Sequence, residues 1–171
     1  MTTAPEILTT QRMRGERLGP EHEDVLAPIL ADPRVGATMG GVATAAEVAE
    51  QLASAAERWE RDGFGYWMFF EAASGAPVGR GGLSRTEFDG RPEVEVGWTV
   101  TPERWGNGLA TELGAAALEV AFGCLGLPDI VAFTLPHNTA SRRVMEKLGF
   151  AYEKTAPYRQ YGDHVLYRRR P

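Results

Sequence analysis

A glycine-rich segment that joins a strand-like stretch to a helix-like stretch is the part of this chain best suited to chemistry. Its sequence is Arg104-Trp105-Gly106-Asn107-Gly108, and the apolar positions of a helix begin directly after it at Leu109. At such a junction free backbone N–H groups and the positive end of a helix dipole converge and favour a phosphate or another anion. Glycine allows the backbone to approach such a group, but it also suits a plain turn, and the segment alone leaves both interpretations open.

Two nucleotide-binding motifs do not fit this segment. A P-loop needs Gly, four residues and then Gly-Lys-Ser/Thr, and the chain contains no such run. A dinucleotide fingerprint needs a third glycine three positions after Gly108, where Thr111 stands, and it follows the first strand of a domain. The glycine-rich segment is therefore neither a P-loop nor a dinucleotide-binding fingerprint.

The composition argues against disulfide-rich, metal-binding and nucleic-acid-binding proteins. The chain has 171 residues, a net charge of −5, one cysteine and three separated histidines, His22, His137 and His164. One cysteine excludes a disulfide framework, and scattered histidines argue against a metal cluster. The negative charge disfavours a nucleic-acid partner. Without a signal peptide or an apolar run of about 18 residues, we expect one cytoplasmic domain over residues 1–171, with no metal and no membrane contact.

The elements that must position the glycine-rich segment follow from hydrophobic periodicity and punctuation. Thr44 and Glu47 form a capping-box pattern at the start of one helix, and Asp32-Pro33 ends an earlier helix that begins near Pro20. The other expected helices cover residues 45–61, 109–124 and 139–148, and the expected strands cover 12–18, 66–71, 78–84, 93–100, 129–135, 150–153 and 165–168. This order predicts a mixed α/β (α+β) domain with one central sheet.

Residues 93–100 alternate most clearly. Val94, Val96, Trp98 and Val100 occupy one face of the predicted strand, and Glu93, Glu95, Gly97 and Thr99 occupy the other. Such alternation is typical of a half-buried strand. From spacing alone, the two glutamates are charges that face solvent.

Three runs together resemble the GNAT acetyl-CoA-dependent N-acetyltransferases. They are Glu95 to Val100, Trp105 to Glu112 and Asn138 to Phe150, and the Trp-Gly-x-Gly-x-Ala pattern is similar to the RimJ/RimL-type branch. The strong match covers residues 93–153. The resemblance implies the GNAT fold, a single domain whose twisted, mixed sheet of six or seven strands is splayed where acetyl-CoA enters.

The resemblance also implies how acetyl-CoA is bound. Backbone N–H groups from Gly106 to Thr111 would hold the pyrophosphate, with Arg104 either adding charge or facing solvent. The backbone of the preceding strand would pair with the pantetheine arm, and Asn138 would bond to it. The expected cofactor contacts are Trp98, Thr99, Val100, Arg104, Trp105, Gly106, Asn107, Gly108, Leu109, Ala110, Thr111, Asn138 and Ser141.

Amide formation needs a neutral amine, so a carboxylate must accept the amine proton directly or through water. Glu95 is the candidate in the family context, and Glu93 is the reserve. Many members use a tyrosine to protonate the CoA thiolate, but Met145 stands at that position. The resemblance instead assigns this role to Ser141, with Asn138 helping to orient the groups; the alternative for both is a simple helix start.

Cys124 follows the apolar stripe of its helix, which predicts a core thiol and disfavours an acyl-cysteine intermediate. We therefore expect direct transfer of acetyl to a primary amine in a ternary complex. The branch favours a protein or peptide N-terminus; a small amine such as an antibiotic, and a non-catalytic acyl-CoA sensor, are the alternatives. Trp59, Trp67 and Tyr66 are expected mostly in the core or the pocket wall, where some of them could shape the acceptor site. The residues that could line it from the other side are Tyr158, Arg159, Tyr161 and His164. Relatives of this type are often homodimers, although no surface in the sequence indicates one.

Overall fold

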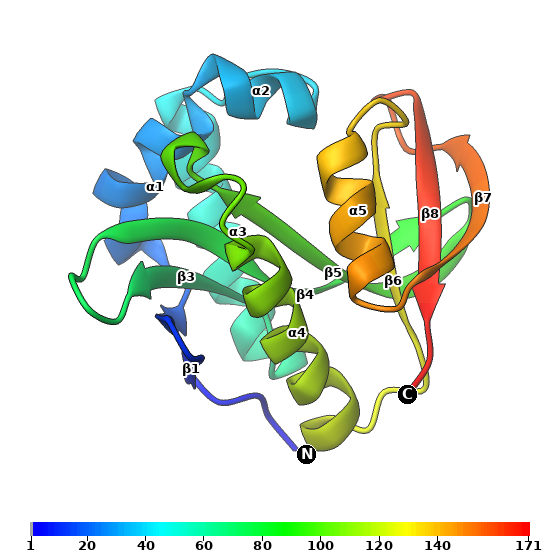
Figure 1. Cartoon of the computed structure of the whole chain (residues 1–171), viewed down its shortest axis with the longest axis horizontal. Helices are drawn as coiled ribbons and strands as arrows, with labels where there is room; N and C mark the ends of the chain where they lie inside the picture. Colours follow the sequence, from blue (N-terminus) through cyan, green and yellow to red (C-terminus); the bar gives the residue numbers. More distant parts are fainter. Residues whose placement is uncertain (1) are drawn as a thin grey trace.

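One mixed sheet of eight strands runs through the computed structural model, which describes residues 2–171 (Figure 1). The strand order is β1-β2-β3-β4-β5-β6-β8-β7, and every neighbouring pair is antiparallel except β5 and β6. The strands are β1 (Ile7–Thr9), β2 (Met13–Arg17), β3 (Tyr66–Glu71), β4 (Pro77–Phe88), β5 (Arg91–Val100), β6 (Ile130–Thr134), β7 (Ala151–Pro157) and β8 (Asp163–Arg169).

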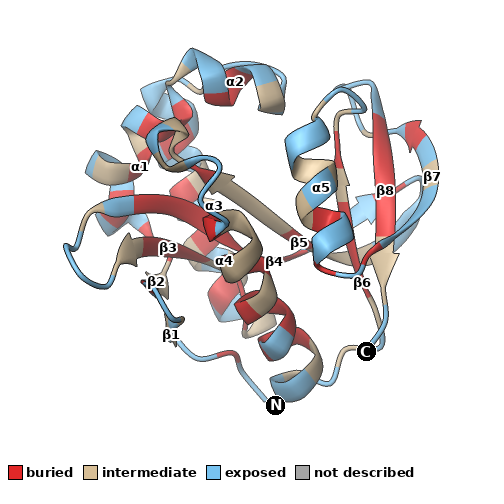
Figure 2. Cartoon of the chain, viewed as in Figure 1, coloured by how far each residue is buried: buried red, intermediate tan, exposed pale blue. Residues whose placement is uncertain are grey.

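Helices cover both faces of the sheet. They are η1 (Pro20–His22), α1 (Glu23–Leu30), α2 (Pro33–Met39), α3 (Ala45–Asp62), η2 (Pro102–Arg104), α4 (Leu109–Glu119), the π-helical turn η3 (Val120–Cys124) and α5 (Thr139–Lys147). One core joins the sheet to α4 and α5, and a second core joins its other face to α1, α2 and α3. Figure 2 shows the buried residues concentrated along the central strands and on the sheet-facing sides of the helices.

The mixed α/β fold with one central sheet that the sequence predicts is confirmed, with one strand more than expected. Ile7–Thr9 forms β1 because it pairs with β2, Ile7 opposite Glu16. The basic run Arg168 to Arg170 near the end of the sequence lies partly within β8. Its first member, Arg168, has only 9% of its side chain exposed.

Capping residues fix where the helices next to the site begin. Thr44 Oγ1 accepts from the backbone N–H of Glu47, and Glu47 accepts in return from the N–H of Thr44, so the capping box of α3 is formed. Asp32-Pro33 ends α1 but also starts another helix, α2, which the sequence analysis missed. The Asp32 carboxylate accepts from the N–H of Arg34 at 2.8 Å, which is an N-cap.

The alternation of β5 is also confirmed. Val96 and Val100 are buried in the core beneath α4, together with the half-buried Val94 and Trp98. Glu95, Gly97 and Thr99 therefore point to the face covered by α1–α3. Among residues 2–171, no helix is long and apolar enough to cross a membrane.

Candidate functional site

The sheet opens between β5 and β6. These parallel strands are in register only at Glu95 opposite Val131, and their carboxyl ends diverge from there. A cavity of about 940 Å³ lies along this opening, lined from both sides by β5, the 101–111 segment, α2, α3 and α5. The N-termini of α4 and α5 both follow the carboxyl ends of these two strands, so both helices begin at the cavity (Figure 1).

Glu95 lies at the base of this opening, on the side of α3. Its carboxylate is partly buried and lines the cavity. Burial raises its pKa from 4.5 to about 7, and only the longer-range attraction of Arg58, Arg159 and Arg80 opposes this rise. A carboxyl group in this state exists in both protonation forms near neutral pH, as a proton acceptor requires.

Glu93, the reserve candidate for the proton acceptor, does not line the cavity. It shares the face of Glu95 but lies two residues before the strands diverge. Arg168 of β8 binds both its oxygens, at 2.8 and 2.9 Å, and only 8% of the Glu93 side chain is exposed. Glu93 is therefore held in a structural ion pair.

The glycine-rich segment forms the other end of the cavity. Gly106 and Gly108 both have φ of 77°, in the left-handed region, and Gly108 is the N-cap of α4. A Cβ at Gly106 would meet nothing within 4 Å, so the backbone conformation rather than space requires glycine there. The segment leaves the first N–H groups of α4 open toward the cavity, an arrangement that suits an anion.

Three side chains of this segment have structural contacts. The Trp105 indole donates to the carbonyl of Val100 at 2.7 Å, which fixes the turn after β5. Asn107 donates to the carbonyls of Arg104 and Trp105 and, unlike the other expected cofactor residues, does not line the cavity. Arg104 lines the cavity but is paired with Glu71 at 2.6 Å.

The start of α5 brings Asn138 and Ser141 to the same cavity. Asn138 Oδ1 accepts from the N–H of Ser141 at 3.2 Å, and its amide nitrogen donates to Thr134 Oγ1 at 3.0 Å. This cap uses the backbone of Ser141 and leaves its hydroxyl available. Met145, at the position of the tyrosine in many relatives, is buried one turn further along and also lines the cavity.

Tyr66 of β3 lines the same cavity as Glu95. Its ring extends across β4 and β5 so that its hydroxyl lies against the Cα of Gly97, and a Cβ at Gly97 would collide with that hydroxyl. Burial and the charge of Glu95 raise the Tyr66 pKa far above its ordinary value, so the hydroxyl stays protonated. Tyr66 is thus a neutral hydroxyl in the wall of the cavity.

Two further parts of the wall were missed by sequence reasoning. Arg80 of β4 is buried and lines the cavity, and it donates to Gln51 of α3 at 2.9 Å. The only signal was an arginine set among glycines in the run Val-Gly-Arg-Gly-Gly. Helix α2 adds Met39, whose sulfur accepts from Thr99 Oγ1 at 3.7 Å.

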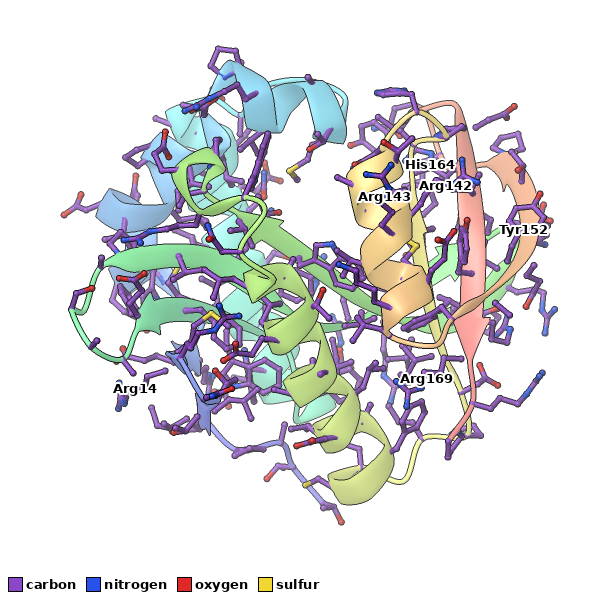
Figure 3. All side chains as sticks on the ribbon, in the orientation of Figure 1. Arg14, Arg142, Arg143, Tyr152, His164 and Arg169 are labelled. Carbon is purple, nitrogen blue, oxygen red and sulfur yellow. The ribbon has the colours of Figure 1, made fainter. Side chains whose placement is uncertain are left out.

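The remaining acceptor-side candidates divide into two groups. Tyr158, Tyr161 and His164 line the cavity from the β7–β8 side, and Figure 3 labels His164 together with Arg143 of α5, which lines the cavity as well. Trp59 and Trp67 do not line it, since they pack edge to face in the core at 5.2 Å between ring centroids. Arg159 is exposed and stacks over Tyr158.

The expectation for Cys124 was wrong. It is exposed and its thiol contacts the carbonyl of Thr3 at 3.5 Å, because the π-helical turn η3 rotates the end of this helix away from the core. It lies outside the cavity. Among residues 2–171, no three His, Cys, Asp or Glu side chains are grouped as a metal site would need.

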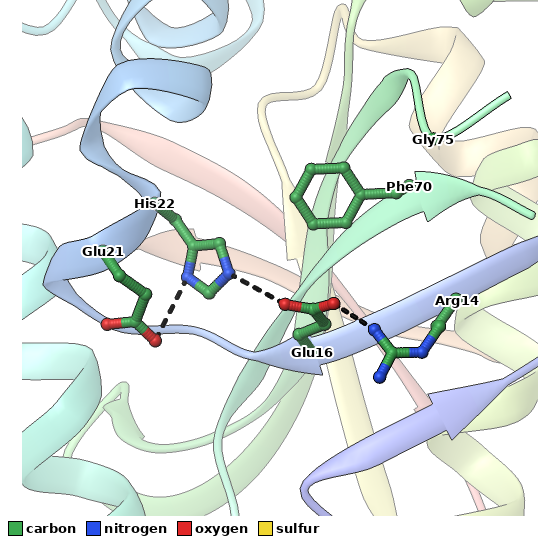
Figure 4. A pocket seen from close by; sticks show the side chains of 6 residues that line it. All are labelled: Arg14, Glu16, Glu21, His22, Phe70 and Gly75. Carbon is green, nitrogen blue, oxygen red and sulfur yellow. Dashed lines mark hydrogen bonds and ion pairs between the residues drawn. The ribbon is translucent and has the colours of Figure 1, made fainter.

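A second, smaller hollow of about 430 Å³ lies on β2 and β3, away from the divergent strands (Figure 4). The buried His22 lies there between Glu16 and Glu21, with nitrogen–oxygen separations of 3.7 and 3.6 Å. It contains none of the residues that the sequence analysis selected.

The chemistry available in the main cavity is therefore specific. A carboxyl group with a pKa of about 7 lies at its base, the uncapped start of α4 faces it, and an available hydroxyl lies at the start of α5. These groups can accept a proton, bind an anion and donate a hydrogen bond to a leaving group.

Comparison with known proteins agrees with this fold. A family model described as an acetyltransferase (GNAT) domain matches residues 12–151. The chain is 31% identical over 164 residues to the FsC-acetyl coenzyme A-N(2)-transacetylase of Aspergillus fumigatus, covering 89% of this chain and 68% of that protein. It is also 31% identical over 93 residues to the protein YkkB of Bacillus subtilis (strain 168), a match that spans about half of each chain.

Solved structures show the same architecture. An acetyltransferase from Agrobacterium tumefaciens superposes with a TM-score of 0.85 at 24% identity, covering 100% of this chain and 98% of the other. RimL, a ribosomal L7/L12 alpha-N-protein acetyltransferase in complex with coenzyme A, superposes with a TM-score of 0.76 at 16% identity, covering 96% and 98%. Because the family model covers most of the chain and the transacetylase matches it almost end to end, this protein belongs to the GNAT acetyltransferase family.

Proposed function

We propose that this protein transfers an acetyl group from acetyl-CoA to a primary amine by direct transfer in a ternary complex. The observation that carries the proposal is the carboxyl group of Glu95, with a pKa of about 7, at the point where β5 and β6 separate. Acetyl-CoA supplies the acetyl group already activated as a thioester.

Different residues would bind different parts of acetyl-CoA. Backbone N–H groups at Gly106 to Thr111 would hold the cofactor's pyrophosphate, since the left-handed glycines leave open space beside the start of α4. The free side of β5 at Trp98 and Thr99 would pair with the pantetheine arm as an added strand does. The Arg104 guanidinium already pairs with Glu71, so it would contact the phosphates only while shared between them and this carboxylate.

Glu95 would act as the general base. An alkyl amine has a pKa near 10.4 and an α-amine one near 7.7–8.0, so each must lose a proton to attack. As the nitrogen bonds to the acetyl carbon and the carbon–sulfur bond breaks, the amine proton passes to Glu95, directly or through water. The departing sulfur would receive a hydrogen bond from the Ser141 hydroxyl, with Asn138 holding Ser141 in place.

We further propose that the acceptor is a protein or peptide N-terminal amine, in the manner of the RimJ/RimL-like branch. The likeness in fold to RimL and the Asn-x-x-Ser start of α5 support this assignment. A small-molecule amine is the second candidate, because the relative that matches 89% of this chain is named as an N(2)-transacetylase.

The first experiment measures thermal unfolding with and without acetyl-CoA, followed by release of free thiol on addition of amines. Ligand at about 100 times its Kd adds about 2.7 kcal/mol, which corresponds to several degrees for a chain of this size. We expect the shift in both the native protein and Glu95→Gln, and turnover only in the native protein. An acyl-CoA sensor would show the shift and no turnover in either, and a protein without the shift would contradict the proposal.

A further inference from the structure

Arg80 is a buried cation without a compensating anion. Its residue is 9% exposed, and the exposed part lies on the main cavity, which it lines. Its one hydrogen bond goes from Nη2 to Gln51 Oε1 at 2.9 Å. Its Nε is the one buried side-chain nitrogen or oxygen among residues 2–171 that has no hydrogen-bond partner.

The neighbours of Arg80 hold it in position but do not neutralise it. Gln51 is neutral, and the guanidinium lies 5.9 Å from the centre of the Tyr66 ring, a cation–π contact. Glu95 attracts it only at longer range, and no carboxylate in the described chain lies within 4 Å of it. Buried charges in proteins are otherwise paired, so this one has the character of a binding group.

The strand register places Arg80 on the same face of the sheet as Glu95. On β4 and β5 the pairs Ser84–Glu95, Gly82–Gly97 and Arg80–Thr99 share one face, and the Tyr66 ring lies over the middle pair. Four residues at about 3.3 Å each separate the first and last pairs by roughly 13 Å along the strands. A molecule that lies across Tyr66 can therefore reach both Glu95 and Arg80.

We propose that Arg80, held by Gln51, is the subsite for a carboxylate that the acceptor carries several bonds away from its amine. This inference rests on the proposed function, because Glu95 defines where the amine is placed. A free α-amino acid, whose amine and carboxylate are joined through one carbon, should therefore be a poorer acceptor than a molecule with several bonds between the two groups. The carboxylate belongs either to an acidic side chain near the N-terminus of a peptide or to a small ω-amino acid.

The test compares matched acceptors that differ only in this charge. One arm uses the peptide amides Ala-Glu-Ala and Ala-Gln-Ala, and the other uses ε-aminocaproate and its amide. We expect the native enzyme to prefer the carboxylate by 10- to 100-fold in kcat/KM in at least one arm, the range of a charge-assisted hydrogen bond. The arm that shows the preference identifies the source of the carboxylate.

Arg80→Gln should reduce that preference to about one. Arg58→Gln is the matched control, because Arg58 also attracts Glu95 but does not line the cavity. If Arg80 acts only through its attraction for Glu95, both variants should shift the pH profile of kcat/KM and keep the preference for the carboxylate acceptor. That result would overturn the proposal. Equal kcat/KM for both members of each pair in the native enzyme would overturn it as well.

Two measurements keep the test independent of turnover and of folding. Calorimetric titration of the acceptors into native enzyme saturated with coenzyme A should show tighter binding of the carboxylate member. The midpoint of thermal unfolding of Arg80→Met should equal or exceed that of the native protein, since an unpaired buried charge is removed. A fall of several degrees would assign Arg80 a structural role.

The failure of this proposal is distinguishable from the failure of the proposed function. If acetyl-CoA raises the unfolding temperature and neutral amines are acetylated without any preference for the carboxylate, only the Arg80 subsite fails. If no amine in either arm is acetylated, the proposed function fails.

Discussion

At the scale of single residues, two glutamates on one face of one strand have opposite fates. Glu93 gives both oxygens to Arg168, whereas Glu95 keeps its oxygens free at the cavity and interacts with three arginines only at longer range. The difference lies in where β5 leaves β6, which happens at Glu95. The ion pair with Arg168 therefore gives Glu93 a structural role, whereas the unpaired Glu95 has a pKa of about 7.

Replacing Glu95 by Gln should remove the pH dependence that this carboxyl group imposes on turnover. The native kcat/KM should rise with pH through an inflection near 7, because only the ionised form accepts a proton. Glu95→Gln should lower the rate by about 10²- to 10⁴-fold and lose this inflection. Initial rates between pH 5.5 and 9 measure both effects.

The inflection near 7 must not move when acceptors with different amine pKa values are compared, which separates it from titration of the amine. Glu87→Gln is the control, since Glu87 is an exposed carboxylate on the neighbouring strand β4. An inflection retained in Glu95→Gln would assign the titration to another group.

The same carboxyl group should affect stability with a definite sign. The pKa of Glu95 is higher in the folded state than in the unfolded chain, so the native protein binds the proton more tightly and loses stability as pH rises from 4.5 to about 7. The shift corresponds to at most about 3 kcal/mol. Glu95→Gln should therefore match the native unfolding temperature at pH 4 and exceed it at pH 8.

At the level of elements, glycines on β4 and β5 leave room for the ring of Tyr66, which extends from β3. Gly82 and Gly97 face each other across β4 and β5, and the Tyr66 hydroxyl occupies the space that a side chain at Gly97 would need. The hydroxyl of Tyr66 therefore reaches the cavity wall between Glu95 and Arg80.

Gly97→Ala should destabilise the protein by about 1–3 kcal/mol, because the new Cβ collides with the Tyr66 hydroxyl. The double variant with Tyr66→Phe lacks that hydroxyl and should regain a large part of the loss. Urea midpoints at constant slope measure both. A single variant as stable as the native protein, or a double variant without recovery, would refute this account of the contact.

The loop before α4 depends on backbone conformation rather than on space. Gly108 has φ of 77°, and the nearest atom to a Cβ there is Arg12 Nη2 at 3.6 Å. Gly108→Ala should cost about 1–2 kcal/mol in the left-handed conformation and reduce the stabilisation by acetyl-CoA. Gly123→Ala, where a Cβ meets nothing within 4 Å and φ is not positive, should leave both quantities unchanged.

At the scale of the whole molecule, distant segments meet on both sides of the divergent strands. Helix α2 contacts the β6–α5 connection where His137 Nε2 lies 3.3 Å from the carbonyl of Ala37, and it contacts the segment after β5 where Arg34 binds Glu103 at 2.5 Å. Below the opening, Arg168 joins β8 to Glu93, Asp129 and Glu153. Helix α2 thus connects elements on the two sides of the opening (Figure 1).

Arg168→Met should destabilise the protein by about 3 kcal/mol, because Glu93 is left buried without its partner. Arg170→Met is the matched control, since Arg170 is exposed two residues further along and should tolerate the change. Denaturant midpoints compare the two. Equal midpoints would show that Glu93 finds another partner or is protonated at little cost.

The sequence by itself determined the features that depend on neighbouring residues. The capping box at Thr44, the alternation of residues 93–100 and the Asn138 start of α5 use contacts within a few positions, and each is formed as expected. The glycine-rich turn and the mixed α/β order of elements followed from patterns of the same kind, whereas the GNAT fold was implied by the resemblance to that family.

Only the tertiary structure decided which of these residues share a cavity and which are neutralised. Glu93 and Arg168 are 75 positions apart, and Arg80 meets Gln51 across 29 positions, so no local pattern shows that one charge is paired and the other is not. The exposure of Cys124 likewise depends on the π-helical turn at the end of its helix. Burial and charge pairing arise from contacts between distant segments, and these set the pKa of Glu95 and leave Arg80 without an anion.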